Sequence, residues 1–139
     1  MKTLLTLVAI LPLLAACADS GNTASLSAYE GRKLVINYWA QWCKPCIKEI
    51  PELNELAAHH SDIAVLGVNY DGLAGEELNA QIEALGIEFP TLAADPSAEL
   101  GVPRPVVLPT TFIVDQSGTV IDTLLGPQTL ASLQAALEK

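Results

Sequence analysis

The sequence predicts an α/β domain in which a central mixed β-sheet carries helices on both faces. Residues 63–68 form a continuous apolar run, which is typical of a strand buried in a parallel sheet. Such runs alternate with segments whose apolar residues recur at helical spacing, so the first strands should be parallel. Near the C-terminus, Gln116-Ser117-Gly118 separates two β-prone segments and predicts a hairpin. The sheet should therefore begin parallel and end antiparallel.

Each element has a local reason in the sequence. Residues 34–39 are apolar and β-prone, and the segment after Cys46 has apolar residues near helical spacing up to His59. Gly86 predicts the end of a second helix. The expected elements are strand 34–39, the helix that follows the cysteines, strand 63–68, helix 76–85, an extended piece at 88–92, a helical turn at 98–101, strands 111–115 and 119–123, and a closing helix at 127–138.

Length and composition indicate one folded domain. The chain has 139 residues, and half of them are hydrophobic, which is enough apolar content for a core. Its formal net charge is −9. An acidic surface argues against nucleic acid and anionic lipid headgroups as partners.

The first residues indicate export. Met1-Lys2 precedes an apolar run at 3–14, which is too short to span a membrane comfortably. Leu14-Ala15-Ala16-Cys17 resembles a bacterial lipobox, which implies removal of residues 1–16 and acylation of Cys17. An ordinary cleaved signal peptide and an uncleaved anchor are the alternatives. Residues 17–27 are small and polar and predict a flexible tether, with the folded domain at 28–139.

The motif Trp42-Cys43-Lys44-Pro45-Cys46 is the chemical centre of the sequence. With Cys43 at the first turn of a helix, its sulfur meets backbone N–H groups and the positive end of the helix dipole, both of which favour the thiolate. Cys46 lies on the same helix face, with Cβ atoms roughly 5–6 Å apart. Pro45 suits a first helical turn. The motif predicts a reversible dithiol/disulfide pair.

A strand, Trp-Cys-x-x-Cys and a helix in this order resemble the thioredoxin superfamily. The extended motif over residues 42–51 is similar to the TlpA/ResA/DsbE-like branch, which contains membrane-tethered, extracytoplasmic thiol-disulfide oxidoreductases. The resemblance covers residues 28–139 and implies a thioredoxin-like fold. It also implies that Pro109, within Leu108-Pro109-Thr110-Thr111-Phe112, is a cis-proline beside the cysteines. The backbone of Leu108 would then pair with an incoming extended peptide.

Glu49 stands three residues after Cys46, on the same helix face. The resemblance places a glutamate here close to the dithiol, where it could exchange a proton with Cys46 while a mixed disulfide resolves. A solvated helix glutamate is the alternative. Lys44 could stabilise the Cys43 thiolate, or it could be an exposed, mobile lysine. Trp42 is expected to shield the cysteine site.

The resemblance implies an enzyme that exchanges disulfides with exported proteins, as a reductant, with apocytochrome c among the possible substrates. The redox pair would need no bound cofactor, but it would need a membrane or periplasmic electron donor. We expect a monomer in the cell envelope, facing the periplasm and held by lipid on Cys17; Ala18 favours the outer membrane over the inner. The segment 101–108 is longer and richer in proline than the usual family loop, which affects the expected substrate groove.

Metal binding is the principal alternative. A thioredoxin-like copper chaperone would typically have three residues between its cysteines and a distal histidine, and neither is found here. A zinc site with Cys43, Cys46, His59 and His60 would need histidines that are not adjacent. A peroxidase of the peroxiredoxin type would need a Pro-x-x-x-Thr-x-x-Cys motif, and haem attachment would need histidine at position 47.

Overall fold

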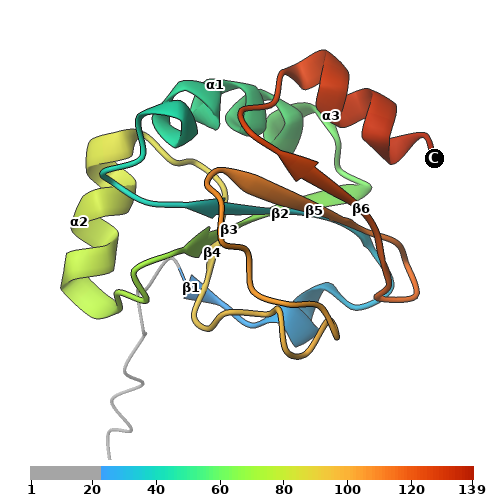
Figure 1. The fold of residues 1–139 in the computed structure, drawn as a ribbon, viewed down its shortest axis with the longest axis horizontal. Coiled ribbons are helices and arrows are strands. Elements are labelled where there is room, and N and C mark those ends of the chain that lie inside the picture. The colour runs from blue at the N-terminus through green and yellow to red at the C-terminus, as the bar shows by residue number, and fades with distance from the viewer. Residues whose placement is uncertain (1–22) are drawn as a thin grey trace, which may run out of the picture.

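The computed structural model describes residues 23–139, so the predicted leader and Cys17 lie outside the described residues. A six-stranded sheet has the order β1-β4-β3-β2-β5-β6 (Figure 1). Among residues 23–139, no helix has the length and apolar character needed to cross a membrane. In chain order the elements are β1 (Thr23–Ala24), the 3₁₀ helix η1 (Leu26–Tyr29), β2 (Lys33–Trp39), α1 (Lys44–His59), β3 (Ile63–Asn69), α2 (Gly75–Leu85), β4 (Thr91–Leu92), β5 (Thr110–Val114), β6 (Val120–Leu125) and α3 (Leu130–Leu137).

Strand β2 lies at the centre of the sheet and sets the position of the site. It pairs parallel with β3 and antiparallel with β5, and β5 pairs antiparallel with β6, as predicted. In the antiparallel register, Tyr38 lies opposite Thr110. The residues that follow β2 and those that precede β5 therefore meet at the same end of the sheet. These residues are the cysteine motif and the Leu108-Pro109 segment.

The two faces of the sheet are covered differently: the three α-helices share one face, and the helix on the other face is the 3₁₀ helix η1. Buried residues of α1, α2 and α3 all join one hydrophobic cluster, together with Val35 and Trp39 of β2. The opposite face carries η1 and the segment between β4 and β5, which lies below the sheet in Figure 1. Four prolines in that segment limit it to hydrogen-bonded turns, such as that from the Leu100 N–H to the Pro96 carbonyl.

Two predicted boundaries differ from the structure. The domain begins within the predicted tether 17–27, because β1 pairs with β4 at the edge of the sheet and the Ala93 N–H donates to the Ala24 carbonyl. The closing helix begins at Leu130 instead of residue 127, because the Thr129 side chain caps it by accepting the Ser132 N–H. Residues 127 and 128 therefore lie outside α3, where the backbone N–H of Gln128 is available to the site.

Candidate active site

Cys43 and Cys46 form a disulfide at the start of α1, with their Cα atoms 5.3 Å apart. Cys43 is the N-cap residue, and its sulfur accepts the backbone N–H of Cys46 at 3.2 Å. Pro45 lies in the first turn of α1, as predicted, where its missing N–H leaves no helical hydrogen bond unmade. The local structure thus places the Cys43 sulfur against the unpaired donors and the positive end of the helix dipole.

Both cysteines are largely buried, with Cys43 4% exposed, but only Cys43 lines a groove. A groove of about 450 Å³ reaches Cys43, whereas Cys46 is not among its lining residues and is 1% exposed. A polypeptide in the groove would therefore meet Cys43 and not Cys46. The groove is lined by Trp42, Cys43, Lys44, Pro45, Tyr70, Val106 and Leu108.

The Leu108–Pro109 peptide is cis, as expected. Pro109 is buried next to β5, and Leu108 is half-buried at the groove. Within residues 23–139, the backbone N–H and carbonyl of Leu108 have no hydrogen-bond partner. These two groups are therefore open to pairing with an extended peptide laid along the groove.

The other predicted residues of the motif line the groove from the solvent side. Trp42 is 64% exposed, and its indole N–H donates to the Asp71 carboxylate at 3.0 Å. Its ring packs edge-on against Tyr70, with centroids 6.5 Å apart. Trp42 thus covers the groove rather than the buried sulfur. Lys44 is exposed and makes no ion pair among the described residues, so a role for Lys44 or Pro45 in redox tuning stays a prediction.

Glu49 is held in the interior by three segments that are distant in sequence. Its side chain is 1% exposed, which rules out the solvated-glutamate alternative. One carboxylate oxygen accepts the Asn37 side-chain amide at 2.6 Å and the other accepts the Gln128 backbone N–H at 2.8 Å. Burial raises the pKa of Glu49 to about 7, although both hydrogen bonds act in the opposite direction. A group with this pKa can take or give a proton near neutral pH.

Asn37 was not identified from the sequence, although it is the one amide in the apolar run 34–39. Its amide nitrogen also donates to the Thr111 hydroxyl at 3.0 Å, while its own carbonyl oxygen has no partner among the described residues. Reversal of the amide would let that oxygen accept a hydrogen bond from the O–H of a neutral Glu49. Asn37 can therefore form a hydrogen bond with Glu49 whether the carboxyl group is charged or neutral. Gln128 could not have been found, because it binds through its backbone.

The histidines of the alternative zinc site lie far from the cysteines. His59 and His60 are at the C-terminal end of α1, where the His59 ring contacts the Glu55 carbonyl at 2.9 Å. In the part of the chain that the structure describes, no group of three or more His, Cys, Asp or Glu side chains could hold a metal ion. The residues at the site are suited to sulfur chemistry.

A buried cysteine pair at a helix N-terminus, beside a cis-proline in a mixed sheet, defines a thiol-disulfide oxidoreductase with a thioredoxin-like fold. The chain belongs to the AhpC/TSA family, whose family model matches residues 9–123.

Individual relatives agree with this class. The thiol-disulfide oxidoreductase ResA of Bacillus thuringiensis (strain Al Hakam) is 30% identical over 86% of this chain and 69% of its own length. The thioredoxin-like protein YneN of Bacillus subtilis (strain 168) is 32% identical over 86% of this chain and 71% of its own. A crystal structure of a DsbF homologue from Corynebacterium diphtheriae has a TM-score of 0.71 at 26% identity, covering 83% of this chain and 76% of its own. The predicted fold class and enzyme class are confirmed.

Replacement of Glu49 by Gln should change how stability depends on pH. Because the folded-state pKa of Glu49 is raised to about 7 from an ordinary 4.5, the folded protein is stabilised by the proton at low pH and loses that stabilisation as pH rises through this range. We expect the Glu49→Gln variant to gain stability relative to wild type over the same range, by up to about 3 kcal/mol. Urea unfolding at a series of pH values measures this difference.

Glu52→Gln is the matched control, because Glu52 is also on α1 and accepts a backbone N–H, that of Leu130 at 2.7 Å. A stability difference between wild type and Glu49→Gln that does not vary with pH would contradict the assignment.

Proposed function

We propose that this protein reduces disulfides in exported polypeptides. The observation that carries the proposal is the asymmetry of the pair: the groove reaches Cys43, at the N-cap of α1, while Cys46 is buried behind it. An accessible sulfur that favours the thiolate attacks, and a protected sulfur one turn away resolves.

The exchange transfers two electrons from the protein to its partner. The Cys43 thiolate attacks one sulfur of the partner disulfide, forms a mixed disulfide with it and expels the second partner sulfur as a thiolate, which takes a proton from water. Cys46 then loses its proton and attacks the Cys43 sulfur. The Cys43–Cys46 bond forms, the mixed disulfide breaks, and the partner leaves as a dithiol. A dithiol donor must afterwards reduce Cys43–Cys46 again.

Glu49 is the proposed acceptor of the Cys46 proton. It lies three residues further along α1, on the same face, and its pKa of about 7 suits proton exchange near neutral pH. Its negative charge also has a thermodynamic effect. A buried carboxylate disfavours a nearby thiolate and so disfavours the reduced pair relative to the disulfide. A pair whose disulfide is favoured in this way is a better electron donor, which supports the direction of transfer that we propose.

The cellular setting follows from the N-terminal pattern. The apolar run 3–14 followed by Leu14-Ala15-Ala16-Cys17 supports export and a lipid anchor on Cys17, so that the domain works outside the cytoplasm. Disulfides form and persist in that environment, so exported polypeptides there contain disulfides on which a reductant can act. The partners are exported polypeptides, and the electron donor is a dithiol at the membrane or in the periplasm.

Trapping tests the proposed roles of the two sulfurs. Reduced Cys46→Ser protein, mixed with a purified polypeptide that has one disulfide, should accumulate a mixed disulfide on Cys43, because the resolving thiol is missing. Mass spectrometry identifies the linked residues. Reduced wild type should convert the polypeptide to its dithiol, and the Cys43→Ser control should form no adduct. An inactive wild type, or equal trapping by both variants, would contradict the proposal.

The reduction potential tests the role of the Glu49 charge. Well above the Glu49 pKa of about 7, the Glu49→Gln pair should be less reducing than wild type, on the order of 10–30 mV less negative, because the carboxylate no longer disfavours thiolate. Equilibration with a dithiol of known potential measures this shift, and Glu52→Gln serves again as the control. A potential that becomes more negative in Glu49→Gln would refute the electrostatic argument.

A further inference from the structure

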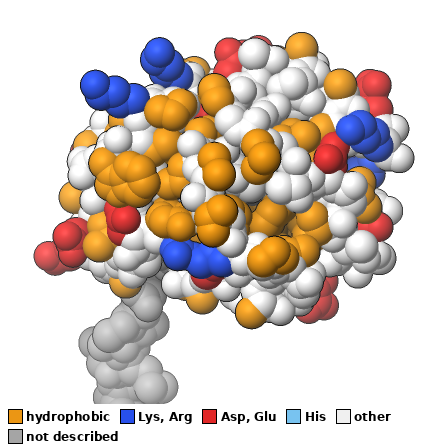
Figure 2. All heavy atoms as spheres, in the orientation of Figure 1, with side chains coloured by type: hydrophobic (Ala, Val, Ile, Leu, Met, Phe, Trp, Pro, Cys, Tyr) orange, Lys and Arg blue, Asp and Glu red, His pale blue; other side chains and the backbone are white. Residues whose placement is uncertain are grey.

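The segment between the turn at Gly101 and the cis-proline, which we call the 102–107 loop, forms one wall of the groove. Val106 lines the groove beside Cys43 and is 91% exposed, an unusual state for a valine without a partner. Figure 2 shows hydrophobic side chains gathered on the face that it draws. The large exposed ones in the described part of the chain are Trp42, Ile47, Val106, Val107, Ile121 and Leu125.

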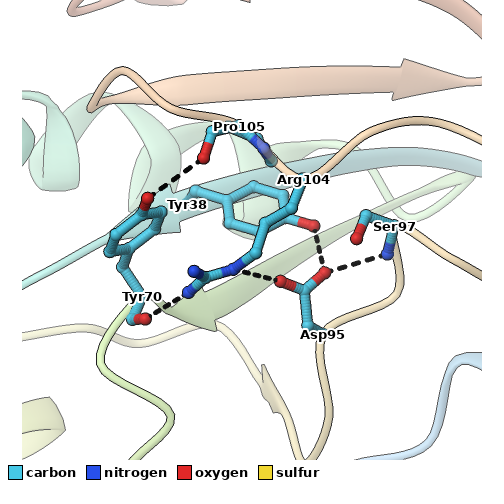
Figure 3. Close-up of polar contacts among 6 residues, drawn as sticks. All are labelled: Tyr38, Tyr70, Asp95, Ser97, Arg104 and Pro105. Carbon is cyan, nitrogen blue, oxygen red and sulfur yellow. Dashed lines mark hydrogen bonds and ion pairs between the residues drawn. The ribbon is translucent and has the colours of Figure 1, made fainter.

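Arg104 fixes this loop through three contacts, of which the two hydrogen bonds are drawn in Figure 3. Its Nε donates to Asp95 Oδ2 at 2.8 Å, and its Nη2 donates to the Tyr70 carbonyl. Its guanidinium carbon lies 4.0 Å from the centroid of the Tyr70 ring. A planar guanidinium can make an ion pair, a backbone hydrogen bond and a stacking contact at once, whereas a lysine ammonium cannot.

The partners of Arg104 are themselves held by the core. Tyr38, a fully buried residue of β2, donates its hydroxyl to Asp95 Oδ1 at 2.7 Å, and the Ser97 N–H donates to the same oxygen at 2.9 Å. Burial alone would raise the pKa of Asp95, but the hydrogen bonds from Ser97, Tyr38 and Arg104 outweigh it and hold that pKa below its usual value. Asp95 is therefore a negatively charged partner for Arg104, and its hydrogen bond with Tyr38 holds it to the central strand β2.

The same arrangement connects the loop to the groove floor. The Tyr70 hydroxyl donates to the Pro105 carbonyl at 3.2 Å, so the loop is held at Pro105 as well as at Arg104 (Figure 3). Pro103 and Pro105 flank Arg104 and restrict the backbone further. Tyr70 in turn packs against Trp42 on the opposite side of the groove. A partner residue adjacent to the reacting cysteine thus meets Trp42, Tyr70 and Val106, whose side chains are largely apolar. A charged side chain would lose its hydration on approaching them, which costs free energy.

We propose that Arg104 is a positioning residue that holds Val106 in place as the wall of the groove, and that this wall selects polypeptides with a large apolar side chain next to the reacting cysteine. The inference rests on the proposed disulfide exchange at Cys43. The inference adds the class of partner and the residue that selects it. The Arg104 guanidinium does not contact the reacting sulfurs and acts through the position of Val106.

Two disulfide peptides that differ only in the residue before one cysteine, Leu or Ser, test the selection. Hydroxyethyl disulfide, which is too small to reach Val106, reports on the redox pair alone. Wild type should reduce the Leu peptide about tenfold more efficiently than the Ser peptide, in the range that one small apolar contact supports. Arg104→Gln should lose most of this preference, mainly through KM, with an unchanged rate on hydroxyethyl disulfide. Val106→Ser should also lose most of the preference.

A double variant tests whether Arg104 acts through Val106. Combining Arg104→Gln with Val106→Ser should cost little beyond either single change, because both remove the same wall. Arg104→Lys keeps the charge beside Asp95 but loses the planar fork, and should retain part of the preference; it also serves if Arg104→Gln fails to fold. The control is Arg32→Gln, which removes the chain's other arginine, bonded to the Ser61 and Ile63 carbonyls, and should leave the preference intact.

The outcomes separate this inference from the proposed function. Equal reduction of both peptides by wild type would overturn the inference and leave disulfide reduction standing. A slower reaction of Arg104→Gln with hydroxyethyl disulfide would also overturn it, since the arginine would then support the redox pair itself. Fully additive effects in the double variant would show that Arg104 does not act through Val106. Failure of wild type on every disulfide would overturn the proposed function.

Discussion

A sulfur in the N-cap position of a helix is the interaction on which the rest of the structure depends. An N-cap side chain normally supplies an oxygen to an N–H group of the first turn. Here the Cys43 sulfur accepts the Cys46 N–H, and the same geometry brings the two sulfurs within bonding reach. The helix therefore stabilises the anion that the reaction uses. The parallel and antiparallel pairings of β2 then bring the cis-proline segment to that helix end, where the groove reaches Cys43 but not Cys46.

Glu49 opposes the helix. The dipole and the N–H groups favour thiolate, whereas a buried carboxylate nearby disfavours it, so the acidity of the pair is set by two effects of opposite sign. The carboxylate stays in the interior because Asn37 from β2 and the Gln128 backbone before α3 both donate to it. Gln128 lies just before the start of α3, where no helical carbonyl accepts its N–H. The Arg104 network has a comparable origin, because Tyr38 connects it to the same central strand.

The parts of the site that the sequence predicted are those encoded by local spacing. The Cys43–Cys46 pair, its place at a helix start and the order of elements along the chain all follow from periodicity and from turn residues close in the chain. The cis state of Pro109 came from family resemblance, because X–Pro statistics alone favour trans. What could not be predicted depends on contacts between distant segments: Asp95 with Arg104, and Glu49 with a backbone group of Gln128. The different covering of the two faces was not predicted for a related reason, since apolar spacing shows that a residue is buried but not what covers it.

The acidity of Cys43 tests the central claim most directly. In the reduced Cys46→Ser variant, Cys43 is the only redox-site thiol, and its thiolate can be followed by ultraviolet absorbance or by its alkylation rate as pH rises. If the helix N-terminus governs the site, the pKa of Cys43 will lie clearly below the value of about 8.5 for a free cysteine. A pKa at or above that value would mean that burial and Glu49 outweigh the helix, and would contradict the account.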